Sequence, residues 1–122
     1  MENLVVWFEL PVVDMDRAKR FYSEVFKLDI QLESFGDKPY GFFPIHGYGN
    51  SGALVKSMDF QPSAKAATVY LNGGQDLEDP LSRVEAAGGK ILVPKTMISR
   101  EMGYYALFLD SEGNRVGLHS MR

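Results

Sequence analysis

Three side chains in this sequence stand out as candidates for acid–base or metal chemistry. Glu9 lies in the run "VVWFELP", His46 in the turn "IHGYGN" and His119 in the closing run "GNRVGLHS". An imidazole titrates near neutral pH, so His119 paired with Glu9 could abstract a proton from a small carbonyl compound. That pair would support isomerase or lyase chemistry. With His46 added, the three side chains would be candidate ligands for a divalent metal ion.

Each of these side chains also has a structural interpretation. His119 can be a wall residue whose ring is hydrogen-bonded to a neighbouring strand, and His46 can be a surface loop residue. Glu9 needs a partner such as His119, Arg115 or a lysine if its carboxylate is buried. Ser120 follows His119 directly, and neighbours on a strand point to opposite faces, so a Ser-His-Asp hydrolase is not supported.

The composition narrows the function classes. At 122 residues the chain suits one compact domain, residues 1–122. Sixteen acidic and thirteen basic residues are interspersed, and this argues against a nucleic-acid partner. The absence of cysteine excludes disulfides and cysteine zinc sites. The opening "MENLVVWFEL" lacks a signal-peptide pattern and no apolar run reaches membrane-spanning length, so we expect a cytoplasmic protein with no membrane partner.

The two halves of the sequence resemble each other. Setting "GYGNSGALV" over "SEGNRVGLH" aligns Gly49 with Gly113 and Leu54 with Leu118. Each half then reads as a strand, a helix and further strands, so we expect a duplicated module. Module one covers about residues 4–56, a linker about 57–65, and module two about 66–120.

Hydrophobic periodicity locates the two helices. The first begins after Asp14 or Asp16, and its apolar residues recur at helical spacing: Ala18, Phe21, Tyr22, Val25 and Phe26. The second opens at Asp79-Pro80 and ends at Gly88-Gly89. Strands are expected at 4–10, 30–35, 40–44, 51–56, 67–71, 90–93, 104–109 and 115–119. We interpret residues 95–106 as a loop, either exposed to solvent or closing as a lid.

These elements predict an α+β fold. Two tandem βαβββ modules would join into one curved mixed sheet with a concave cup, and the helices would pack outside. Strand alternation directs Val6, Phe8 and Leu10 toward the helices, and it places a set of cup-lining candidates on the other face. That set is Trp7, Glu9, Ala53, Val55, Thr68, Tyr70, Gly117 and His119. Aromatic walls with a few polar groups are typical of a small-molecule site.

Three segments carry a family resemblance. The runs "PVVDMDRAKRFYSEVF", "RVEAAGGKIL" and "DSEGNRVGLHS", in this order, resemble the vicinal oxygen chelate superfamily of glyoxalases, bleomycin-resistance proteins and extradiol dioxygenases. The resemblance covers about residues 6–120 and implies the fold described above. It also implies metal ligands on the first and last strand of each module. Those positions are Trp7, Ala53, Thr68 (or Val69) and Gly117, and none of the first-named four supplies a usual metal-binding group.

The residues and the resemblance together support one main hypothesis and two alternatives. The main hypothesis is a glyoxalase-like domain without a metal cofactor that sequesters or senses a small hydrophobic or aromatic ligand. Its candidate ligand-binding residues are Trp7, Val55, Thr68, Tyr70, Gly117 and Tyr105. The first alternative is a lyase or isomerase that uses Glu9 and His119 as an acid–base pair or as ligands of a relocated divalent metal. The second is an accessory domain that acts through a protein partner or a homodimer, with exposed sheet edges and the aromatic segment 40–48 as its surface.

Overall fold

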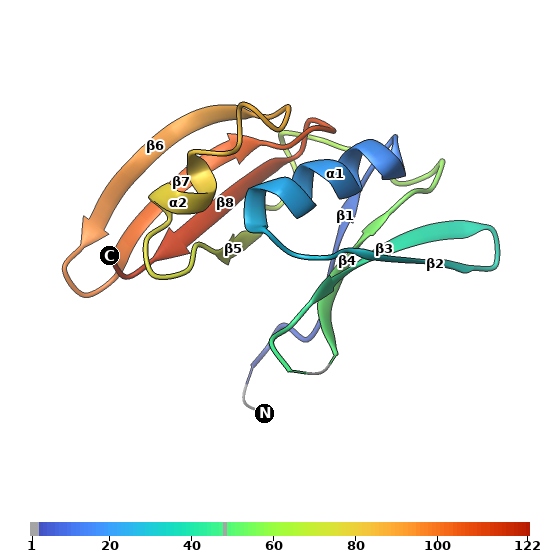
Figure 1. Cartoon of the computed structure of the whole chain (residues 1–122), viewed down its shortest axis with the longest axis horizontal. Helices are drawn as coiled ribbons and strands as arrows, with labels where there is room; N and C mark the ends of the chain where they lie inside the picture. Colours follow the sequence, from blue (N-terminus) through green and yellow to red (C-terminus); the bar gives the residue numbers. More distant parts are fainter. Residues whose placement is uncertain (1–2, 48) are drawn as a thin grey trace.

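The computed structural model describes residues 3–47 and 49–122, and in these residues each module has a βαβββ order. Module one contains β1 (Phe8–Pro11), α1 (Met15–Phe26), β2 (Gln31–Phe35), β3 (Lys38–Pro44) and β4 (Asn50–Val55). Module two contains β5 (Tyr70–Asn72), α2 (Glu78–Leu81), β6 (Lys90–Ser99), β7 (Gly103–Leu109) and β8 (Arg115–Ser120) (Figure 1). The α+β class and the tandem modules are as predicted. Residue 48, the far end of the 40–48 segment, lies outside the described residues.

Hydrogen bonding divides the expected curved sheet into two four-stranded mixed sheets, one from each module. Their strand orders are β1-β4-β3-β2 and β5-β8-β7-β6. In each sheet the first and last strands of the module pair in parallel, and the remaining pairs are antiparallel. β1 and β5 are therefore edge strands, each hydrogen-bonded within its sheet on one side.

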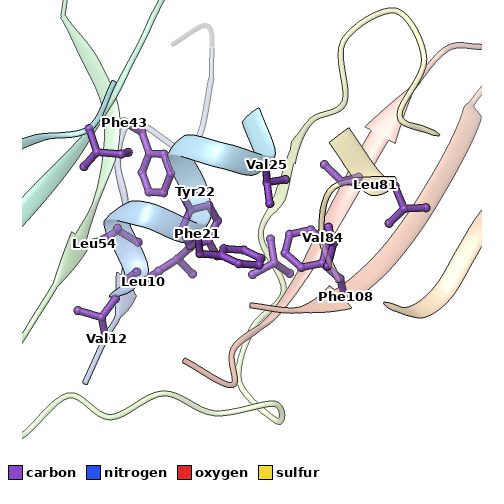
Figure 2. Packing of buried hydrophobic residues seen from close by; sticks show 14 of the residues in the cluster. Leu10, Val12, Phe21, Tyr22, Val25, Phe43, Leu54, Leu81, Val84 and Phe108 are labelled. Atoms are coloured by element: carbon purple, nitrogen blue, oxygen red, sulfur yellow. The ribbon is translucent and has the colours of Figure 1, made fainter. Parts of the chain in front are cut away.

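Helix α1 packs against both modules. The Asp14 side chain accepts a hydrogen bond from the Arg17 backbone N–H, which caps the helix start, and Lys27 ends the helix in a left-handed conformation. The Tyr22 ring meets Phe43 of β3 edge-on, and the Phe21 ring lies 6.0 Å from that of Phe108 in β7. Figure 2 shows these α1 side chains between residues of the two sheets. One buried apolar cluster consequently includes both modules.

A buried polar network crosses the same boundary. The Tyr22 hydroxyl donates to Asp110 at 2.6 Å, and the Asn114 amide donates to the Pro11 carbonyl at 2.8 Å. Asp110 and Asn114 are almost fully buried. Because these polar groups find partners inside the protein, their burial ties module two to β1 and α1.

Two expected elements have different boundaries. β1 begins at Phe8, and Leu4, Val5 and Val6 are largely exposed, so Val6 does not face the helices. The expected second helix is shorter, since α2 ends at Leu81 and a series of turns continues to Gly88. Leu77, Leu81 and Val84 are nevertheless buried, as their spacing predicts. Several backbone hydrogen bonds in this stretch span three residues, and this pattern is typical of tight turns and not of α-helix.

The segment predicted to be a loop or lid is a β-hairpin. β6 extends to Ser99 and β7 starts at Gly103, so most of residues 95–106 is strand. The pairing of these strands contains register shifts at three places. Each bulge interrupts the two-residue alternation, and for this reason the strand pattern is hard to recognise in the sequence. None of the helices in the described part of the chain is long and apolar enough to span a membrane.

Candidate ligand site on the cup face

The cup face is the side of each sheet that faces away from the buried apolar cluster. In β8, Val116 and Leu118 belong to that cluster, so Gly117 and His119 point the other way. In β4, Leu54 belongs to the cluster and Ala53 does not. This alternation agrees with the sequence-based assignment of faces in both strands.

Tyr70 and Gly117 form a close pairing on the cup face. They are register partners in the parallel β5–β8 pair. A Cβ atom added to Gly117 would lie 2.4 Å from the Tyr70 ring, too close for any real side chain. The ring therefore lies against the bare glycine backbone, and its residue is still 52% exposed. A side chain at position 117 would have to displace Tyr70.

A hydrophobic cavity of about 420 Å³ lies on one side of Tyr70. Its walls are Tyr70, Ile98, Tyr105 and His119. Tyr105 and His119 are cross-strand partners in β7 and β8. The His119 Nε2 atom lies 2.6 Å from the Met102 carbonyl oxygen. Because a carbonyl oxygen only accepts hydrogen bonds, Nε2 carries the proton, and Nδ1 of the neutral ring is left as an acceptor.

An inter-module cleft of about 740 Å³ also includes Tyr70 in its wall. Module one contributes His46 and Ser51, and module two contributes Thr68 and Asn72; the other lining residues are Val5, Phe8, Pro44, Ile45, Val69 and Leu71. Thr68 accepts hydrogen bonds from Arg115 at 2.8 and 3.2 Å. Tyr70 is thus common to two hollows, and the cleft brings His46 to residues of the second module.

An aromatic row lines the cup face of module one. It consists of Trp7, Phe35, Tyr40 and Phe42, with neighbouring ring centroids 5.3 to 6.1 Å apart. Trp7 also donates a hydrogen bond to the Glu9 carboxylate at 3.3 Å. Trp7 was expected on this face from the sequence, but the other three rings were not. The available signal was that Tyr40 and Phe42 alternate along the strand with the buried Gly41 and Phe43.

The structure brings some candidate residues together and separates others. Tyr70, Tyr105, Gly117 and His119 gather around one cavity, with Thr68 in the adjoining cleft. Val55 is a buried residue opposite Tyr40 and lines neither hollow. Glu9 lies in the first sheet and His119 in the second, and no hydrogen bond between described side chains joins them.

The four positions that the family resemblance implies as metal ligands do not present a usual set of metal-binding groups. Trp7, Ala53, Thr68 and Gly117 present an indole, a methyl group, a hydroxyl and a hydrogen atom. Within residues 3–47 and 49–122, no three His, Asp or Glu side chains gather as metal ligands. Glu9, His46 and His119 are therefore not assembled into a relocated site in the single chain.

A third hollow, of about 730 Å³, is lined in part by Val12 and Val13, which precede α1. Its lining includes Lys38 and Lys56 together with Asp37 and Asp59. The two positive and two negative formal charges cancel, and none of its lining residues is aromatic. It lacks the exposed ring that distinguishes the cup face.

Comparison with known proteins agrees with this architecture. Residues 4–118 match the family described as the Glyoxalase/Bleomycin resistance protein/Dioxygenase superfamily. The chain belongs to this superfamily. A glyoxylase-like domain-containing protein from Didymella fabae is 29% identical over 111 residues, which are 87% of this chain and 84% of that protein.

Two solved structures share the fold of this chain. A glyoxalase I mutant from Zea mays has a TM-score of 0.71 and 21% identity over 94% of this chain. The present chain spans only 45% of that plant protein. TnmS3, an antibiotic binding protein from Streptomyces sp. CB03234, has a TM-score of 0.70 and 25% identity, with 97% of this chain and 95% of that one covered.

Proposed function

We propose that this superfamily member binds a small hydrophobic or aromatic molecule on its cup face and thereby sequesters or senses it. One observation carries the proposal: the half-exposed Tyr70 ring is held against Gly117 and forms a wall of both hollows. A fixed, exposed ring beside a concave surface is suited to stacking on a planar ligand.

The similarity to an antibiotic binding protein of nearly equal length supports a binding role. The residue types at positions 7, 53, 68 and 117 support a site that works without a metal cofactor. A binding role needs only the hollow and its aromatic wall, both of which the described residues supply.

A fluorescent probe tests this proposal. N-phenyl-1-naphthylamine is a neutral aromatic molecule whose emission rises in apolar sites. We expect saturable binding to the wild-type chain, and Tyr70→Ala to weaken it about five- to thirtyfold because a stacking surface is lost. Phe60→Ala removes an exposed ring outside both hollows and serves as the matched control. Absence of saturable binding, or equal affinity in wild type and Tyr70→Ala, would refute the proposal.

An acid–base enzyme is the second candidate, and the His119 hydrogen bond favours it. The bond to the Met102 carbonyl leaves Nδ1 of the neutral ring able to accept a proton. Glu9 instead accepts a hydrogen bond from Trp7, so a catalytic role for Glu9 would require that it move toward His119. The test is exchange of the α-protons of acetophenone in D₂O, followed by NMR. Exchange that His119→Ala abolishes and His46→Ala preserves would support this candidate, and exchange equal to that in buffer would remove it.

We also propose a second copy of the chain as a partner. Leu4, Val5 and Val6 are 71 to 86% exposed immediately before β1, an apolar segment that association would remove from water. Sedimentation velocity should show a dimer that Leu4→Ser combined with Val6→Ser weakens. A wild-type chain that stays monomeric at about 100 μM would contradict this proposal.

A further inference from the structure

We infer that the inter-module cleft binds the acidic group of the ligand, so that the ligand is an aromatic acid. This inference rests on the proposed function, because it names the ligand class of the same site. It starts from Arg115, which is partly buried at the start of β8 and points to the same face as Gly117 and His119.

Arg115 is partly buried, and its hydrogen-bonding partner is a neutral hydroxyl. The ion pairs among the described residues are Arg17–Glu112, Arg83–Asp79 and Lys95–Asp76. Arg115 takes part in none of them, and its side chain hydrogen-bonds only to the Thr68 hydroxyl within the described part of the chain. A partly buried guanidinium without a carboxylate favours the approach of an anion.

The two Arg115 hydrogen bonds determine what the Thr68 hydroxyl can do. The Nε and Nη2 groups both donate to Oγ1, at 3.2 and 2.8 Å, and they occupy its two lone pairs. The hydroxyl proton of Thr68 is then its remaining hydrogen-bonding group, so toward a ligand Thr68 can only donate. Because Thr68 lines the cleft and Arg115 does not, Arg115 acts through Thr68 as a positioning residue.

The other polar groups of the cleft can also donate hydrogen bonds to an acceptor group of a ligand. Asn72 uses its side-chain oxygen to accept from the Gly74 backbone N–H at 2.8 Å, and its amide hydrogens remain as donors. His46 and Ser51 can donate as well. No Asp or Glu is found among the described residues that line the cleft, so no carboxylate would repel an acidic ligand.

The spacing of Thr68 and Tyr70 matches a ligand in which an acidic group is attached to an aromatic ring. The two residues are separated by one position, and both line the cleft. A two-residue step along an extended chain is about 6.6 Å, roughly the distance from the centre of a fused ring system to an acidic substituent. A ligand stacked on Tyr70 would therefore place its carboxylate or sulfonate near the Thr68 hydroxyl. Charge-assisted hydrogen bonds are the stronger kind, so this group should add measurably to affinity.

Two matched probes test the inference. 8-Anilinonaphthalene-1-sulfonate has the same aromatic skeleton as N-phenyl-1-naphthylamine but carries a sulfonate. We expect Thr68→Val and Arg115→Met each to weaken sulfonate-probe binding at least about tenfold and to change neutral-probe binding less than about twofold. Thr68→Ser keeps the hydroxyl and should keep the wild-type ratio of sulfonate-probe affinity to neutral-probe affinity. Arg20→Met makes the same charge change on the exposed surface of α1 and is the control.

The ratio of sulfonate-probe affinity to neutral-probe affinity separates a positioning role from a merely structural one. Damage to the fold would lower the affinity for both probes. Failure of the neutral probe to bind overturns the proposed function and this inference together. Binding of the neutral probe that depends on Tyr70, with an unchanged ratio in Thr68→Val and Arg115→Met, overturns only the inference. If Arg115→Met does not fold, the near-isosteric Thr68→Val decides the outcome alone.

Discussion

The Glu112 carboxylate of module two accepts two hydrogen bonds from the Arg17 guanidinium of module one, at 2.7 and 3.0 Å. The same carboxylate accepts the backbone N–H groups of Val13 and Asp14, both at 2.8 Å. It therefore binds the chain at the start of α1, where a negative charge is favoured. This contact joins two segments that are far apart in the sequence. It holds together the two modules that line the cleft.

Replacing Glu112 by glutamine should destabilise the protein. The amide keeps one acceptor oxygen but loses the charge and the second acceptor, so we expect the free energy of unfolding to fall by about 1 to 3 kcal/mol. Urea denaturation at pH 7 measures the change. Glu101→Gln, in the exposed turn after β6, makes the same charge change and should have almost no effect. Equal losses in the two variants would contradict the role of Glu112.

The same contact predicts how stability depends on acid. Burial by itself would raise the pKa of Glu112, but the hydrogen bonds from Arg17, Asp14 and Val13 outweigh it and lower the pKa to about 2. Since the unfolded chain has the higher, ordinary value, the contribution of Glu112 is complete above that value and is lost as the pH falls toward 2. Urea midpoints between pH 7 and pH 2 should fall less steeply in Glu112→Gln than in wild type. Parallel profiles would show that Glu112 does not carry this dependence.

Tyr22 should resist alkaline ionisation. Burial raises its pKa well above the usual tyrosine range, and the neighbouring Asp110 carboxylate adds to the effect. Because the pKa of Tyr22 is higher in the folded state, the neutral Tyr22 stabilises the fold at pH values below its unfolded-state pKa. This stabilisation is lost as the pH rises above that pKa. Absorbance at 295 nm should show a tyrosine ionisation step that occurs only when the protein unfolds. Tyr22→Phe should remove that last phase, and Tyr105→Phe should leave it intact.

Adding one methyl group at Gly117 should disturb both stability and binding. The new Cβ would collide with the Tyr70 ring, so we expect Gly117→Ala to cost about 1 to 3 kcal/mol of unfolding free energy and to weaken binding of the neutral probe. In a Tyr70→Ala background the collision is gone, and the stability cost should fall below about 0.5 kcal/mol. A cost that is the same in both backgrounds would mean that the ring is not the obstacle.

Local patterns predicted the helix and most strands well. Ala18, Phe21, Tyr22 and Val25 repeat at helical spacing, and all four are buried in α1. α2 and β6 were predicted less accurately. Tight turns make α2 shorter than expected, and β6 is longer than expected because its bulges interrupt the alternation that marks a strand in the sequence. Short-range contacts control the well-predicted elements, and docking on the rest of the protein decides the others.

The sequence by itself determined the duplicated architecture, the residues that share a strand face, and the residue types at the four positions where the family resemblance implies metal ligands. Alternation is a local property, so it can assign Tyr70, Gly117 and His119 to faces without knowledge of the partner strand. Only the tertiary structure decided which residues of different modules meet. It placed His46 and Thr68 around one cleft and Arg17 against Glu112, because inter-strand register and helix packing depend on long-range contacts that periodicity does not encode.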